Sequence, residues 1–148
     1  MIVERWGGDL YHISVVYVAN TLTAFILMNV MASKIHLSNV TKFKIGVGST
    51  TFVFIGLSFV TEWWMAMPFM SLVGATWAFL FIGGNFHLME NNPRSTSTGI
   101  FSSTLSISTV IGPVIAGSIA FMFDYVAVMY FAIIIIIGAF LVSLKIKK

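Results

Sequence analysis

Long apolar stretches alternate with short polar connectors along the chain, and this pattern predicts an all-α integral membrane protein. Each stretch is near the roughly 20 residues (range about 17–25) that a helix needs to cross a hydrocarbon core of ~30 Å. We therefore expect a single membrane domain whose transmembrane helices cover residues 13–33, 45–61, 63–89, 98–123 and 125–144. The second is the shortest, whereas the third and fourth are long enough to tilt, kink or protrude.

Composition supports a lipid environment and excludes several other classes of protein. The 148 residues are 58% hydrophobic and only 9% charged, with a mean hydropathy of +0.97, whereas soluble domains carry about 25% charged residues. The chain has no cysteine, which excludes disulfides, thiol catalysis and thiolate metal sites. The net charge of +3 is scattered over connectors and forms no basic patch, so the expected partner is the lipid bilayer and not nucleic acid.

The positions of the basic residues predict how the helices are oriented in the cell membrane. With five crossings, seven of the eight basic residues fall on one side, and Arg5 alone falls on the other. Short cytoplasmic loops carry an excess of lysine and arginine, so we expect the N-terminus outside and the C-terminus in the cytoplasm. The seven predicted cytoplasmic residues are Lys34, Lys42, Lys44, Arg94, Lys145, Lys147 and Lys148.

The fourth stretch, residues 98–123, has an unusual pattern of small residues and contains no charge. Small residues recur every fourth position, at Thr104, Ser108, Gly112, Ala116 and Ala120. Such a smooth helix face allows close packing against another helix in lipid. Pro113 cannot donate to the carbonyl of Thr109, so we expect a kink there. Gly112, Pro113 and Gly117 are therefore predicted to form a packing and flexing element.

The transmembrane segments offer little chemistry. None contains Asp, Glu, Lys or Arg, so the chain supplies no intramembrane carboxylate for proton coupling. No phosphate-binding loop, HExxH motif or glycine-rich dinucleotide turn occurs, and no base lies near the many Ser and Thr residues of the fourth stretch. These observations argue against an enzyme, and we expect neither a metal nor a cofactor.

Four polar or aromatic residues are candidates for a substrate cavity: Asn20, Trp77, Asn85 and His87. A buried asparagine needs a partner, which is either another helix or a permeating solute, and the sequence leaves both interpretations open. Trp77 fits core packing as well as a substrate platform, and His87 fits a hydrated interface. A haem would need two histidines at one depth, which only His36 and His87 offer, and a visible spectrum without a Soret band would exclude it.

The connector and the fourth stretch together carry a family resemblance. Glu90, Pro93, Arg94 and Gly99 precede an Ile-Gly-Pro-x-x-x-Gly core at residues 111–117. This order resembles the eleventh helix of the major facilitator superfamily (MFS) and its preceding cytoplasmic loop, and the chain is similar to helices eight to twelve of that family. The resemblance implies that the first, third and fourth stretches border the substrate cavity and that the second and fifth are peripheral. The basic Gly…Asp-Arg…Gly-Arg motif of the family is absent after the first stretch.

The resemblance implies a part of a secondary transporter for a small solute. A full transporter of this family has two halves with the substrate between them, so we expect a missing N-terminal half or a partner subunit. The alternative is a non-transporting five-helix protein, a remnant or scaffold that acts by helix packing. An upstream reading frame with about seven more apolar spans would favour transport.

Overall fold

The computed structural model describes residues 7–146, and over that range it contains helices and short connectors without any strand. Five helices among the described residues are long and apolar enough to cross a membrane, in agreement with the five predicted helices. The elements, in chain order, are α2 (Leu10–Ser33), α3 (Asn39–Ser58), the 3-10 turn η1 (Trp63–Met65), α4 (Ala66–Asn91), α5 (Arg94–Met122) and α6 (Tyr125–Leu144).

Several helices begin before the apolar stretches that predicted them. The largest difference is at α3, which begins at Asn39 although its stretch was placed at residues 45–61. The hydroxyl of Ser38 accepts a hydrogen bond from the backbone N–H of Thr41 at 3.2 Å and so caps this helix. Lys42 and Lys44 therefore lie inside α3 and not in a connector. Hydropathy locates the part of a helix that suits lipid, whereas a capping residue fixes where the helix begins.

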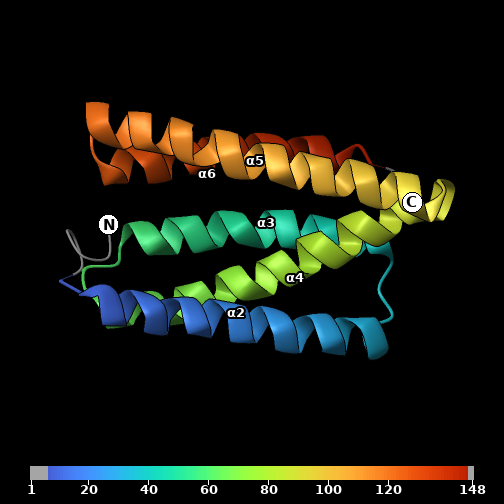
Figure 1. The fold of residues 1–148 in the computed structure, drawn as a ribbon, viewed down its shortest axis with the longest axis horizontal. Helices are drawn as coiled ribbons and strands as arrows, with labels where there is room; N and C mark the ends of the chain where they lie inside the picture. The colour runs from blue at the N-terminus through green and yellow to red at the C-terminus, as the bar shows by residue number, and fades with distance from the viewer. Residues whose placement is uncertain (1–6, 147–148) are drawn as a thin grey trace.

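Helix α4 lies at the centre of the bundle, where it packs against both α2 and α3 (Figure 1). Helix α3 packs in turn against α6, and α5 makes smaller contacts with α4 and α6. Helices α2 and α4 run in the same direction, and α3 runs in the opposite direction (Figure 1). One core cluster joins four elements of the bundle, and its buried residues are Val16, Val53, Leu57, Val60, Ala66 and Met129.

The packing of the second span does not test the prediction that this span is peripheral to a substrate cavity, but it shows that the span has two neighbours. Helix α3, which corresponds to that span, is packed on one side by α4 and on another by α6. Among the described residues of α5, only Ser97 is buried, so within this chain α5 is the helix at the periphery. The polar content of a span therefore did not indicate how many neighbours the span has, because glycines in α3 and α4 bring those two helices together.

Two glycines of α4 allow its backbone to contact the backbones of α2 and α3. A Cβ atom on Gly83 would overlap the backbone of Phe43 and lie 2.8 Å from the carbonyl oxygen of Asn39 in α3. A Cβ atom on Gly74 would overlap the backbone of Asn20 in α2. In lipid, such close contact is a main source of helix association, because hydrophobic burial contributes little between helices. These two positions therefore hold α4 against α2 and α3.

A lysine of α3 binds the end of α6. The Nζ atom of Lys44 donates to the carbonyl oxygens of Ile146 at 2.9 Å and Leu144 at 3.4 Å. The last carbonyls of a helix have no partner within the helix, and a cation there also complements the helix dipole. Lys44 therefore links α3 to α6 where both helices reach the same end of the bundle.

We expect the Gly83→Leu substitution to destabilise the bundle by about 1–3 kcal/mol, as overpacking does in tight interiors. The reason is that α3 has to move away from α4 to make room for the new side chain. Unfolding by denaturing detergent, followed by far-ultraviolet circular dichroism, measures the change. Gly138→Leu is the matched control, since a Cβ atom at Gly138 meets nothing within 4 Å. Equal stability of the two variants would contradict the role assigned to Gly83.

Candidate solute-binding groove

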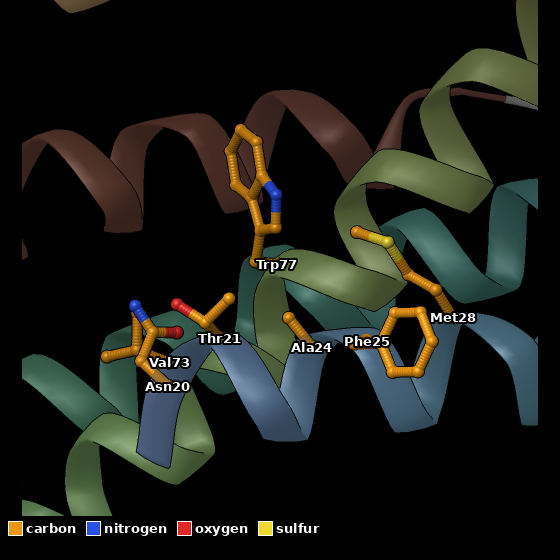
Figure 2. Close-up of a pocket in the computed structure, with 7 residues that line it drawn as sticks. All are labelled: Asn20, Thr21, Ala24, Phe25, Met28, Val73 and Trp77. Atoms are coloured by element: carbon orange, nitrogen blue, oxygen red, sulfur yellow. The ribbon is translucent and has the colours of Figure 1, made fainter. Parts of the chain in front are cut away.

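A groove of about 480 Å³ lies between α2 and α4, which is within the range of about 300–1,000 Å³ that small-molecule sites occupy. It brings together two of the four predicted cavity residues, Asn20 from α2 and Trp77 from α4 (Figure 2). Its lining consists of Asn20, Thr21, Ala24, Phe25, Met28, Val73 and Trp77.

Helical spacing explains why these residues share one surface. Asn20, Ala24 and Met28 recur every fourth position on α2, and residues four apart lie on the same helix face. Val73 and Trp77 have the same spacing on α4. Gly74 lies directly against the Asn20 backbone, and its missing side chain lets the two helix faces meet.

The polar groups of the groove are few, and most of their hydrogen-bonding capacity is unused. Within residues 7–146, the side chain of Asn20 and the indole N–H of Trp77 have no hydrogen-bond partner. The hydroxyl of Thr21 donates to the carbonyl of Tyr17 at 3.0 Å and keeps its oxygen lone pairs available. Figure 2 shows Asn20 and Thr21 at one end of the groove and Phe25 at the other. The groove can therefore offer both donors and acceptors to a bound molecule.

An aromatic row leads from the groove toward α5. The rings of Trp77 and Phe81 have centroids 6.2 Å apart, and Phe81 meets Phe101 of α5 edge to face at 5.3 Å. Trp77 is nevertheless 41% exposed. The Trp77 ring therefore contacts Phe81 and also leaves part of its surface accessible from the groove.

The other two predicted cavity residues lie elsewhere, near the end of α4. The Nδ1 atom of His87 is 3.1 Å from Glu90 Oε2, and Glu90 Oε1 accepts from Asn39 Nδ2 at 2.7 Å. His87 thus belongs to a polar cluster that links α4 to the start of α3. The Oδ1 atom of Asn85 is buried and has no hydrogen-bond partner among the described residues. Sequence spacing placed both residues near the end of the span, but it could not separate them from the groove.

The predicted loop motif spans the end of α4, the turn after it and the start of α5, with Glu90 in α4 and Gly99 in α5. Pro93 is the capping residue of α5, Arg94 begins that helix with an exposed side chain, and Gly99 faces open space. The residue that ties this turn together is Ser97, which is 1% exposed and whose hydroxyl donates to the carbonyl of Leu88 at 3.0 Å. Sequence reasoning missed Ser97 because it lies in a run of similar hydroxyl residues that offers no signal to single it out.

The predicted packing element of α5 is exposed in this chain. Helix α5 continues without a break through Pro113, so the expected kink does not interrupt the helix. A Cβ atom on Gly112 or Gly117 would meet nothing within 4 Å. Gly112 and Ala116 of the smooth face line a hollow shared with Val128 and Phe131 of α6, but the two glycines make no close contact within the described residues. The packing role of this face therefore stays a prediction.

A second polar cluster caps α2 at the opposite end from His87. The Asp9 carboxylate accepts from the His12 backbone N–H at 3.0 Å, and the Asp9 N–H donates to His12 Nδ1 at 3.1 Å. The His12 ring lies over Trp63 with centroids 4.0 Å apart. The hydrogen bond from the His12 backbone lowers the pKa of Asp9 below its ordinary value of 3.8. No group of three metal-ligating side chains occurs within residues 7–146.

We expect the start of α2 to loosen in acid because Asp9 is its cap. A carboxylate whose pKa is lowered by folding adds stability above the ordinary value of 3.8, and this stability is lost as the pH falls through the lowered pKa. Carbon NMR of the Asp9 carboxyl, titrated from about pH 6 to pH 2, measures the shift directly. In the Asp9→Asn variant, amide exchange at His12 should be faster and should lack this titration. An ordinary pKa at Asp9 would contradict the capping interaction.

Comparison of the chain with models of protein families, with curated proteins and with solved structures finds no match.

Proposed function

We propose that this chain is part of a secondary transporter of the MFS type and that the groove between α2 and α4 forms part of its solute path. The observation that carries the proposal is the unpaired amide of Asn20 in that groove. An amide in an apolar environment costs free energy unless it finds a partner. A solute or water in a membrane cavity supplies that partner, and the volume of the groove suits a small molecule.

The exposed face of α5 supports a second membrane component. This face is built from small and hydroxyl residues, and a Cβ atom on Gly112 or Gly117 would meet nothing within 4 Å, although Gly112 also lines a hollow toward α6. Small residues on a transmembrane helix usually serve close packing against another helix. We propose that a partner half, as in transporters with two structural repeats, packs against α5 and covers the groove.

The distribution of charge supports the proposed orientation. Helix ends that meet at one end of the bundle carry Lys34, Lys42, Lys44, Arg94 and Lys145 (Figure 1). The opposite end carries Asp9, Glu62 and Asp124. Arg5, Lys147 and Lys148 lie outside the described residues. We propose that the lysine-rich end faces the cytoplasm and that the chain is a multi-pass protein of the cell membrane.

One alternative function is favoured by the same exposed face of α5. A scaffold that holds another membrane protein would also need a smooth helix surface, and it would need no solute. In that case the groove would be filled by side chains of the partner. The two functions differ in whether loss of the α5 surface changes the movement of a solute.

We expect the Gly112→Leu substitution to abolish transport without preventing insertion or folding. A Cβ atom at this position meets nothing within 4 Å and the site borders a hollow toward α6, so we expect a leucine to be accommodated in this chain while keeping a partner helix from packing closely. The measurement is initial uptake of a panel of radiolabelled neutral and charged small solutes by cells that make the protein from its own gene. Uptake of at least one solute should fall to the level of cells without the gene.

Gly138→Leu is the control, because Gly138 also faces open space but lies on α6. It should keep both membrane insertion and uptake. Wild-type cells that match gene-deleted cells for every solute would contradict transport. If Gly112→Leu lost a co-purifying membrane protein while no solute was affected, the scaffold would be the correct function.

A further inference from the structure

We propose that the groove between α2 and α4 binds an uncharged, amphipathic solute that combines one flat ring with a carboxamide, carbonyl or hydroxyl group. This inference rests on the proposed function only in taking the groove as part of the solute path. It is carried by the unpaired amide of Asn20, by the exposed ring of Trp77 and by the absence of charge from the seven described lining residues.

The amide of Asn20 defines the polar part of the solute. It offers two N–H donors and one carbonyl acceptor, and all of them are unused within residues 7–146. Thr21 adds acceptor lone pairs beside it, since its hydroxyl hydrogen is already donated to Tyr17. A group that both accepts and donates, such as a carboxamide, can pair with both side chains and replace the water that they would otherwise bind.

The aromatic residues define the apolar part of the solute. Trp77 and Phe25 are 41% and 66% exposed, and both line the groove together with Val73 and Met28. Flat rings stack favourably on such surfaces, in offset or edge-to-face geometry. Because Asn20 and Phe25 lie at opposite ends in Figure 2, the solute is expected to lie along the groove with its polar group toward Asn20.

The absence of charge from the described residues near the groove disfavours ions as solutes of this site. Helix α2 contains no Asp, Glu, Lys or Arg, and the first charged residue of α4 is Glu90. Glu90 lies thirteen positions after Trp77, which is about 20 Å along the axis at the helical rise of about 1.5 Å per residue. His12 lies eight positions before Asn20. An ion in the groove would therefore lose its hydration without gaining a counter-charge, which is strongly unfavourable.

A unique thiol can report occupancy of the groove, because the chain contains no cysteine. In the Ala24→Cys variant, alkylation by uncharged N-ethylmaleimide is measured in native membranes with benzamide, benzoate or benzylammonium as competitor. The three probes share one ring and differ in charge. Benzamide should slow alkylation at a concentration at least about fivefold lower than either ion, because an ion loses its hydration in the groove without gaining a counter-charge. Ala139→Cys, on the exposed side of α6, should react equally with and without each probe.

A second pair of variants tests the role of Asn20 itself. In the Ala24→Cys background, Asn20→Leu should raise the protecting concentration of benzamide by about fivefold, because the amide contact is lost. Asn29→Leu is the matched control on the same helix, since Asn29 does not line the groove and its Nδ2 donates to the carbonyl of Phe25. It should leave protection by benzamide unchanged.

Each remaining outcome contradicts a specific part of the proposal. Equal protection by the three probes, or a preference for either ion, would overturn the uncharged class. A thiol at position 24 that does not react at all would show that small molecules do not enter the groove. Protection by benzamide in a protein that moves no solute in cells would support the proposed binding site and contradict the proposed transport function. Transport of ions alone would support the transport function and contradict the proposed uncharged solute.

Discussion

The contact of the α4 backbone with the backbones of α2 and α3 is the interaction on which the rest of the structure depends. Lipid is as apolar as leucine, so two helices in a membrane gain little by burying apolar surface against each other. They gain by close dispersion contact, and Gly74 and Gly83 supply it on opposite neighbours of α4. The buried cluster of the bundle and the groove beside Asn20 both exist because these contacts fix the three helices relative to one another.

Polar residues at the helix ends add caps and interhelical hydrogen bonds to the glycine-mediated packing. Asp9 and Ser38 cap α2 and α3, Lys44 satisfies the last carbonyls of α6, and Glu90 connects α4 to Asn39. Each of these groups lies at or near the end of a long apolar helix. Charged side chains therefore stabilise the ends of the bundle, whereas the middle of each helix is stabilised by packing and contains only a few polar amides.

The sequence predicted the number of spans well because hydropathy acts over whole helices and is insensitive to local detail. The bounds of α6 agree with residues 125–144, since Asp124 caps one end and lysines follow the other. The sequence did not predict that Asn20 and Trp77 would share a groove while Asn85 would not. Helical period gives the face that a residue occupies, but the neighbour of that face depends on where glycines allow helices to meet. For the same reason the smooth face of α5 predicts close packing without identifying the helix that provides it.

Helix α2 has its principal contact with α4 and not with α3, the helix that follows it in the chain. Among the described helices, α2 therefore gains its main neighbour only when α4, two long helices later in the chain, has been made. Until then α2 lacks the close contact that Gly74 makes with the Asn20 backbone. The arrival of α4 is thus the step that fixes α2 within this part of the bundle.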